Sequence, residues 1–295
     1  MADWSRLANY LEDWRHRLLR YPVDRIEARR ARIFHPVETA SPIPRVIVQT
    51  YRTAEVPRPI HAAVTRWQET NPEFEYRFFD DAAARTFIET HFPDEVLRAF
   101  DALVPGAFRA DLWRYCYLVK HGGVYVDIRM EPLMALRTIL DLSAPKPPAF
   151  VSARDIVRPG AGAGFVHNAF VAAAPNHPFL VCALERALKS IANRDYGRNE
   201  LDITGPGCLG AAVNLALGRP FNGPFEPGDH DDRKAGPFRL LLHEADPYHR
   251  KVHSHHGTPF IVTKCLWGQM WRADPEYRQD SYSKYYRKRA VFRRD

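Results

Sequence analysis

The segment from His121 to Met130 constrains the fold most strongly, because it reads as a helix end, a glycine turn and a short strand. Alternation along the predicted strand separates an apolar face from a polar one. The apolar face carries Val124, Val126 and Ile128, and the polar face carries Tyr125, Asp127 and Arg129. A carboxylate, a phenol and a guanidinium then project together from one side of a packed strand. The segment therefore predicts the floor of a site for an anionic, hydroxyl-rich ligand.

The size and composition of the chain favour one large domain. It has 295 residues, of which 45% are hydrophobic, enough to bury a sizeable core. No run approaches the roughly 18 apolar residues of a membrane-spanning helix, and the first residues are too charged for a secretory signal. The four cysteines are far apart with no CxxC pair, so neither a zinc site nor a disulfide framework is indicated. These features predict a soluble, cytoplasmic protein.

Positive charge is concentrated at the two ends of the chain, within a net charge of +7. Residues 3–34 show helical spacing of apolar side chains flanked by arginines, which predicts a basic helical extension over residues 1–40. Such an extension could dock peripherally on an anionic membrane, or it could simply be a solvated basic face. No nucleic-acid-binding pattern accompanies the charge, so a nucleic-acid partner is not expected.

Strand and helix patterns alternate along residues 41–135. Strands are predicted at 45–50 and 74–79, and helices near 59–70 and 106–120. This alternation predicts an α/β domain, residues 41–295, with a mainly parallel sheet flanked by helices. Beyond Met130 the pattern is looser, with strands near 149–153 and 166–173, helices near 178–192 and 207–217, and irregular chain over 219–238.

Two charged residues share one face of the helix predicted at 106–120. Asp111 and Arg114 are three residues apart, which allows an ordinary intrahelical ion pair worth only about 0.5 kcal/mol when exposed. The helix leads directly into the strand that carries Tyr125 and Asp127. We therefore expect both polar sets near one end of the sheet.

Five segments, in this order, resemble glycosyltransferase family 32, which includes yeast-type α-mannosyltransferases and shares its nucleotide-sugar site with clostridial glucosylating toxins. They are Ile43–Thr50, Asn71–Tyr76, Asp80–Asp81, Arg109–Tyr115 and Gly122–Asp127. Downstream, the segments at 168–170, 175–179 and 204–207 are also similar. The segment at 204–207 reads equally well as an anion-binding turn or as a plain helix start.

The resemblance implies a GT-A fold that binds a nucleotide-diphospho-sugar, and it assigns roles to residues of this chain. Asp127, Asp111 and Arg114 become the catalytic candidates, with Asp111 and Arg114 on the sugar hydroxyls. The implied substrate-binding candidates are Gln49, Thr50, Arg109, Tyr125, Arg129, Asn168 and Trp267. Gln49 and Thr50 end a strand, where open α/β sheets bind ligands.

One position departs from the family's Asp-X-Asp motif, whose second carboxylate binds Mn²⁺ or Mg²⁺. That position is Arg129, and a guanidinium has no lone pair for a cation but can bind phosphate in a fork geometry. Arg129 could replace part of the metal's charge, or Asp127 could hold the ion with a late histidine such as His255. A catalytically dead site is the third reading, and we favour the first two.

The resemblance implies a hexosyltransferase that moves mannose, glucose or galactose to a glycan or lipid-linked glycan, with retention of configuration. The alternative is a non-catalytic nucleotide-sugar or carbohydrate-binding module, since the second carboxylate is missing. Donor hydrolysis discriminates between the two.

Overall fold

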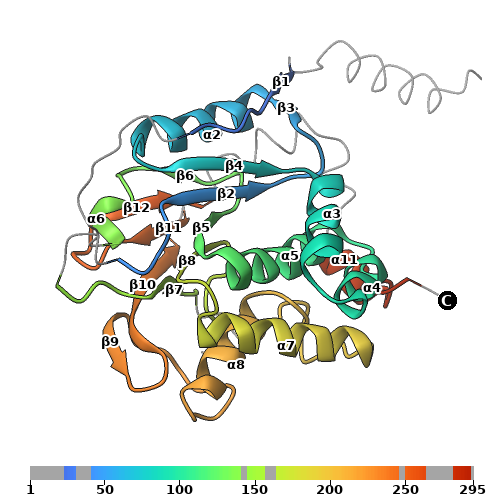
Figure 1. Cartoon of the computed structure of the whole chain (residues 1–295). Coiled ribbons are helices and arrows are strands. Elements are labelled where there is room, and N and C mark those ends of the chain that lie inside the picture. The colour runs from blue at the N-terminus through green and yellow to red at the C-terminus, as the bar shows by residue number, and fades with distance from the viewer. Residues whose placement is uncertain are drawn as a thin grey trace, which may run out of the picture.

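The computed structural model describes residues 23–30, 41–140, 145–156, 164–245, 250–263 and 282–293. It is an α/β structure in which one large sheet lies between two sets of helices (Figure 1). The strands are β1 (Val23–Arg25), β2 (Val46–Thr50), β3 (Glu55–Pro57), β4 (Glu75–Phe79), β5 (Gly123–Val126), β6 (Glu131–Pro132), β7 (Phe150–Arg154), β8 (Phe170–Ala173), β9 (Gly228–Asp232), β10 (Gly236–Ala245), β11 (Arg250–His253) and β12 (Pro259–Val262). The helices are α2 (Arg58–Thr70), α3 (Asp81–His91), α4 (Asp94–Ala102), α5 (Gly106–His121), α6 (Arg137–Leu140), α7 (Pro178–Ala192), α8 (Pro206–Ala216) and α11 (Tyr282–Arg287).

The large sheet has the strand order β4-β2-β5-β8-β7-β10-β11-β12-β6, with β9 also paired to β10. Parallel pairs join β2 to β4 and β5, and β7 to β10, whereas β8, β9, β11, β12 and β6 pair antiparallel to their neighbours. The predicted α/β class is confirmed, but the expectation of a mainly parallel sheet is wrong. Parallel neighbours need a crossover of a dozen or more residues, and the connections among β9, β10, β11 and β12 are too short.

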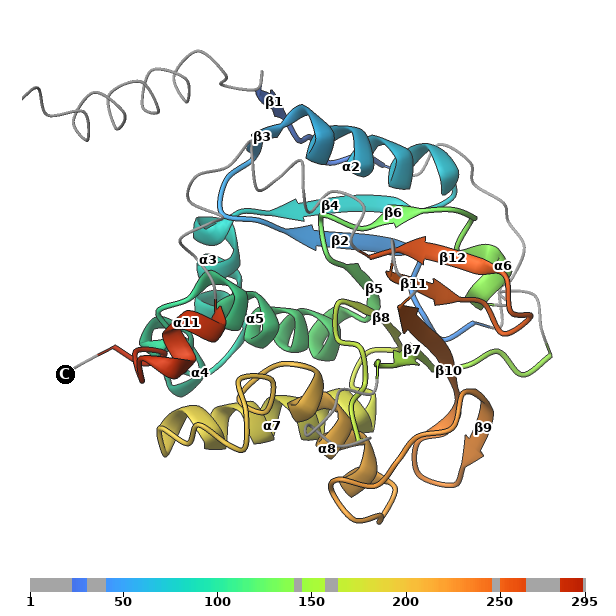
Figure 2. The same ribbon diagram turned by 180° about the vertical axis from the view of Figure 1, so that it is seen from behind.

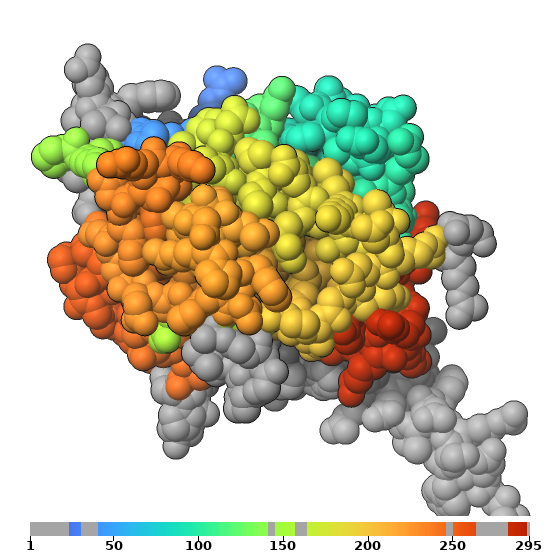
Figure 3. Space-filling view, turned by 90° about the horizontal axis from the view of Figure 1, so that it is seen from below, coloured from blue at the N-terminus to red at the C-terminus, as the bar shows by residue number. Residues whose placement is uncertain are grey.

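Two hydrophobic clusters cover the two faces of the sheet, as alternation along the strands requires. Val124 and Val126 of β5 pack in the cluster that includes α2, whereas Tyr125 faces the cluster that includes α5, α7 and α8. Figures 1 and 2 show α2 on one side of the sheet and α5, α7 and α8 on the other. Seen from below, α7, α8 and β9 form much of the outer surface (Figure 3). Because both faces are covered, β5 is buried along its whole length.

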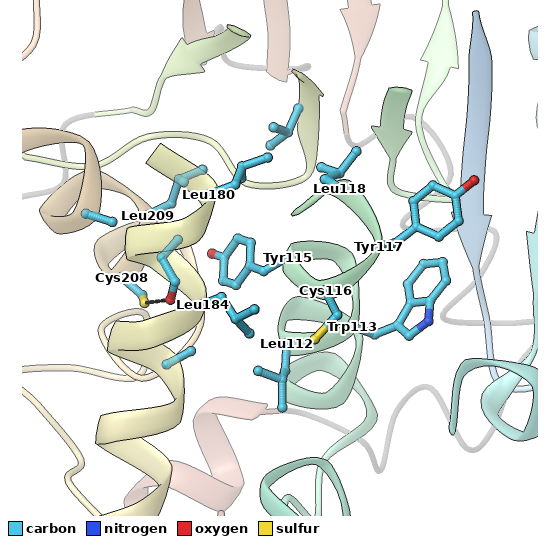
Figure 4. Close-up of a cluster of buried hydrophobic side chains, with 14 of the residues drawn as sticks. Leu112, Trp113, Tyr115, Cys116, Tyr117, Leu118, Leu180, Leu184, Cys208 and Leu209 are labelled. Carbon is cyan, nitrogen blue, oxygen red and sulfur yellow. Dashed lines mark hydrogen bonds between the residues drawn. The ribbon is translucent and has the colours of Figure 1, made fainter. Parts of the chain in front are cut away.

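Helix α5 is packed on both of its sides, which fixes the residues it carries. Figure 4 shows Tyr115 directed toward α7 and α8, while Trp113 and Tyr117 point the other way. All three side chains are at most 1% exposed, and the Tyr115 hydroxyl donates a 2.6 Å hydrogen bond to the Thr204 carbonyl. Any polar group on the remaining face of α5 is therefore held in a rigid frame.

A glycine pair makes the turn from α5 into β5. Gly122 and Gly123 have φ values of 64° and 104°, and the Gly122 nitrogen donates to the Leu118 carbonyl to end the helix. A Cβ at Gly122 would lie 2.7 Å from both the Ala173 carbonyl oxygen and Pro175 Cδ. Only glycine fits this turn.

We expect Gly122→Ala to lower the free energy of unfolding by about 3 kcal/mol, because strain at positive φ and a clash with backbone add together. Urea denaturation measures the change. Gly236→Ala is the matched control, since Gly236 has φ 71° with nothing within 4 Å of an added Cβ, and it should lose only about 1 kcal/mol. Equal losses in the two variants would contradict the close packing at Gly122.

The predicted helical extension is only partly within the described residues. Residues 23–30, expected to be helical, instead form β1, which pairs with β3, and an isolated bridge from Arg29 to Tyr76. The other residues of the predicted extension, 1–22 and 31–40, lie outside the described residues. Among the helices that the structure describes, none is long and apolar enough to cross a membrane.

Candidate active site

Asp127 lies at the carboxyl end of β5, beside the start of β8. Its backbone nitrogen donates a 2.8 Å hydrogen bond to the Ala169 carbonyl, and its own carbonyl accepts from Met130 at 3.0 Å in a turn. The strand predicted to continue through Arg129 therefore ends at Val126. Because Arg129 lies in this turn and not in the strand, alternation does not put it on the same face as Tyr125. Arg129 is still only two residues from Asp127.

Arg114 joins the two acidic candidates. Its Nη2 lies 3.0 Å from Asp111 Oδ1 and 3.2 Å from Asp127 Oδ1, and its Nη1 donates to the Asn168 carbonyl at 2.5 Å. The guanidinium carbon lies 4.2 Å from the centre of the Tyr125 ring. Because the Arg114 side chain is only 4% exposed and its donors point to protein acceptors, it acts by positioning the two carboxylates. The expectation that Asp111, Arg114 and Asp127 converge is confirmed, and the simple surface ion pair is excluded.

Asp111 is held on both of its carboxylate oxygens. Oδ1 accepts a 2.8 Å hydrogen bond from Asn168 Nδ2, and Oδ2 accepts a 3.0 Å bond from Thr204 Oγ1. Burial raises the pKa of Asp111 to about 6, although Arg114, Thr204 and Asn168 favour the ionised form. Asp111 is therefore ionised at neutral pH, where its negative charge pairs with the positive charge of Arg114.

Asp127 is the most exposed acid of the cluster, with 30% of its side chain accessible compared with 16% for Asp111. The Tyr125 hydroxyl donates to its Oδ1 at 2.9 Å. Burial raises the pKa of Tyr125 well above its usual value, so the hydroxyl keeps its proton and stays a donor. Tyr125 is 1% exposed, and it acts through Asp127 rather than by lining a pocket.

The raised pKa of Asp111 predicts an acid limb in the activity profile. As pH falls through about 6, Asp111 gains a proton, loses its charge opposite Arg114 and loses an acceptor for Thr204 or Asn168. We therefore expect kcat/KM for donor turnover to fall below about pH 6, measured as a pH profile. The Asp111→Asn variant should lack this limb. A limb near pH 6 that persists in Asp111→Asn would assign it to another group.

Two other candidates turn out to be structural supports. Gln49 is fully buried, donates to the Val126 carbonyl at 3.2 Å and accepts from the Tyr76 hydroxyl at 2.8 Å. It therefore fixes the strand end that carries Asp127. Thr50 Oγ1 donates to the Phe79 carbonyl at 2.8 Å.

Arg109 is on α5 but is not part of the cluster. Its Nη2 lies 3.1 Å from Asp81 Oδ2 at the start of α3. Arg109 and Arg114 are five residues apart, about 140° around the helix, and the two guanidinium groups pair with different acids. Helical spacing is consistent with this division, although the family motif contains both arginines.

A divalent cation at the Asp-X-Asp position does not fit the described residues. Asp127 Oδ1 already accepts from Arg114 and Tyr125, and Arg129 stands where the motif has its second carboxylate. Of the two motif positions, only Asp127 therefore offers carboxylate oxygen to a cation. A guanidinium offers no lone pair to a cation. We therefore assign no step of the chemistry to a metal at this position.

The predicted metal pairing of Asp127 with His255 is wrong. His255 lies in the turn between β11 and β12, which follows His253, and His253 is registered opposite Leu242 of β10. In the sheet, β11 is four strand spacings from β5, roughly 19 Å at about 4.8 Å per strand, so His255 does not reach Asp127. Trp267 lies outside the described residues.

Thr204 is the functional contact that the sequence reading missed. Its hydroxyl binds Asp111 from 93 positions along the chain, and its carbonyl accepts from Tyr115. From the sequence, the segment 204–207 is similar to the family and reads as an anion-binding turn or a helix start, which gives Thr204 no contact. The sequence does show a hydroxyl side chain, Thr204, directly before the Gly205-Pro206 start of a helix. It does not show that this hydroxyl lies next to α5.

The comparisons with known proteins agree with this geometry. Residues 57–144, which contain Asp111, Arg114 and Asp127, match the family described as glycosyltransferase sugar-binding region containing DXD motif. A mannosyl phosphorylinositol ceramide synthase of Saccharomyces cerevisiae is 28% identical over 238 residues, covering 79% of this chain and 52% of that protein. Inositol phosphoceramide mannosyltransferase 2 of Schizosaccharomyces pombe is 31% identical over 151 residues, covering 50% of this chain and 40% of that protein.

The chain spans about half, or less, of the length of these curated relatives. Among solved structures, PaToxG glycosyltransferase aligns with 72% of this chain and 78% of that chain, at a TM-score of 0.47 and 14% identity. The similarity to glycosyltransferases whose sugar-binding region contains a DXD motif lies in residues 57–144, the segment that also holds Asp111, Arg114 and Asp127.

Proposed function

We propose that this chain transfers a hexosyl group from a nucleotide-diphospho-sugar to a hydroxyl of a glycan or glycolipid, with retention of configuration. The observation that carries the proposal is the bridge that Arg114 makes between Asp111 and Asp127 within the family-matched segment. Such a bridge keeps two carboxylates in fixed positions at the carboxyl edge of the sheet, where α/β folds bind ligands. Fixed acceptors of this kind can orient sugar and ribose hydroxyls.

The chemistry needs no nucleophile from the protein. The bond between the sugar's anomeric carbon and the diphosphate oxygen breaks, and a bond to the acceptor oxygen forms on the same face. The acceptor's proton passes to the leaving diphosphate. Asp127 and Asp111 orient the sugar and ribose, and Arg129 stabilises the charge that develops on the diphosphate.

Mannose is the first donor sugar to test, because the relatives named above are a mannosyl phosphorylinositol ceramide synthase and an inositol phosphoceramide mannosyltransferase. The same names favour a phosphoinositol-containing glycolipid as the acceptor class. Glucose and galactose donors belong in the same screen. GDP-mannose, UDP-glucose and UDP-galactose can be compared by the rate at which each is hydrolysed.

Replacing Arg129 by alanine tests whether a guanidinium stands in for the metal. We expect donor affinity to fall about 10- to 100-fold in EDTA, as for loss of charge-assisted hydrogen bonds. Arg66→Ala is the control, because Arg66 is exposed, pairs with nearby Glu131 and lies on α2; its affinity should be unchanged. Isothermal titration with GDP-mannose measures both. Loss of wild-type binding in EDTA, with no effect of Arg129→Ala, would contradict the substitution of charge for metal.

The second candidate is a non-catalytic nucleotide-sugar-binding module, favoured by the arginine at the position of the second carboxylate. Both candidates predict binding of a donor. Only the transferase predicts slow hydrolysis of that donor by the wild-type chain, so binding without any hydrolysis would select the module.

A further inference from the structure

A second polar cluster lies apart from Asp111 and Asp127 and has no part in the proposed transfer. Asp155 directly follows β7, His243 is in β10, and His167 precedes β8. Leu242 is registered opposite Arg154, so the next residues, His243 and Asp155, lie side by side. The His167 nitrogen donates to the Ala153 carbonyl at 2.8 Å, which holds the third residue against the same strand.

The three side chains converge at distances that suit a metal ion. Asp155 Oδ1 lies 2.7 Å from His243 Nδ1 and 3.5 Å from His167 Nδ1, and one ligand atom from each residue lies within 4.8 Å of the others. Ligands held about 2.1 Å from a tetrahedral zinc ion are about 3.4 Å apart. A small outward shift of His243 from Asp155 would therefore accommodate an ion between them.

The cluster is deeply buried, and one of its polar atoms is unsatisfied. The exposed fractions are 3% for Asp155, 8% for His167 and 3% for His243. Two imidazole nitrogens face one carboxylate oxygen, and His167 Nε2 is buried without a hydrogen-bond partner among the described residues. An ion bound at the Nδ1 edge would not satisfy Nε2, so what favours an ion is the convergence of two buried imidazoles on one buried carboxylate.

A hydroxyl beside His243 also suits a role for this histidine as a metal ligand. His243 Nε2 lies 3.1 Å from Thr263 Oγ1, the kind of contact that orients a ligating histidine. A cleft of about 460 Å³ is lined by Arg154, His243, Lys251 and His253 among others, so it reaches one of the three residues, His243, but not Asp155 or His167.

We propose that Asp155, His167 and His243 form a binding site for one divalent transition-metal ion of the zinc type. Two imidazoles and one carboxylate favour Zn²⁺ over Mg²⁺, which prefers oxygen ligands only. The site shares no ligand with the proposed sugar site, although His167 directly precedes Asn168, which binds Arg114 and Asp111.

Metal binding to the tag-free, EDTA-treated chain tests the proposal without any activity assay. Isothermal titration with ZnCl₂ should show one equivalent bound at least about 100-fold more tightly than Mg²⁺. Asp155→Asn and His243→Gln should each weaken Zn²⁺ binding about 100-fold or more. His253→Gln is the matched control, because His253 lines the same cleft and faces Glu244 at 3.8 Å but lies outside the three ligands; its affinity should be unchanged.

Zn²⁺ binding that survives both ligand variants, or that is lost in His253→Gln, would overturn the proposal. If either ligand variant fails to fold by circular dichroism, X-ray absorption of the zinc-loaded wild-type chain decides instead. The expected spectrum contains two imidazoles and oxygen at about 2.0–2.1 Å. A spectrum without the scattering of two histidine rings would refute the site.

Discussion

Asp127→Asn is expected to reduce donor turnover at least about 100-fold while leaving the protein folded. The change removes the charge of the most exposed acid in the cluster but keeps its shape, and loss of one preorganised electrostatic contact typically costs 10²–10³ in rate. Hydrolysis of GDP-mannose, UDP-glucose and UDP-galactose measures the effect, with thermal unfolding as the check on folding.

Asp101→Asn is the matched control for this prediction. Asp101 is 36% exposed, close to the 30% of Asp127, and it also pairs with an arginine, Arg85, at 2.8 Å. It lies on α4, away from the cluster, so turnover should remain at the wild-type level. Near-normal turnover of Asp127→Asn would remove Asp127 from the site.

Arg114→Met is expected to cause the largest loss of stability, about 3–5 kcal/mol in the free energy of unfolding. The guanidinium is 4% exposed, and its removal leaves Asp111 and Asp127 without the cation that both face. Urea denaturation at neutral pH measures the change. Activity should fall with it, since both carboxylates lose their fixed positions.

Arg85→Met is the matched control, because it removes an arginine that pairs with two acids at the surface. Arg85 pairs with Asp101 and Glu89 at the surface, with 44% of its side chain exposed, so its loss should cost less than about 1 kcal/mol. Similar losses in the two variants would show that the Arg114 bridge contributes little. A second variant, Asp111→Asn combined with Arg114→Met, should recover part of the stability because one unpaired buried charge is removed.

The sequence predicted the local part of the site well, for a physical reason. Helical spacing puts Asp111 and Arg114 on one face, and the double glycine at positive φ can only end α5 and turn the chain into β5. Contacts between neighbouring turns of one helix follow from such periodicity. The apolar face of β5 was also expected, but the burial of Tyr125 on its other face was not.

Contacts between distant segments could not be predicted in this way. Thr204 contacts Asp111 only because Tyr115 and α8 hold the Thr204 backbone in place. Gln49 has a structural role because its amide binds both the Tyr76 hydroxyl and the Val126 carbonyl. Strand direction was likewise missed, because a strand pattern in the sequence does not show which neighbour the strand pairs with or in which direction. The Asp155 cluster draws on three segments with no shared motif.

A crystal structure of the wild-type chain with GDP-mannose, prepared in EDTA, tests the central claim most directly. The account predicts the mannose ring against Asp111 and Asp127, with at least one sugar or ribose hydroxyl within hydrogen-bond distance of a carboxylate oxygen. The diphosphate should face Arg129. A nucleotide-sugar seated elsewhere, with Asp111, Arg114 and Asp127 still paired only to one another, would contradict it.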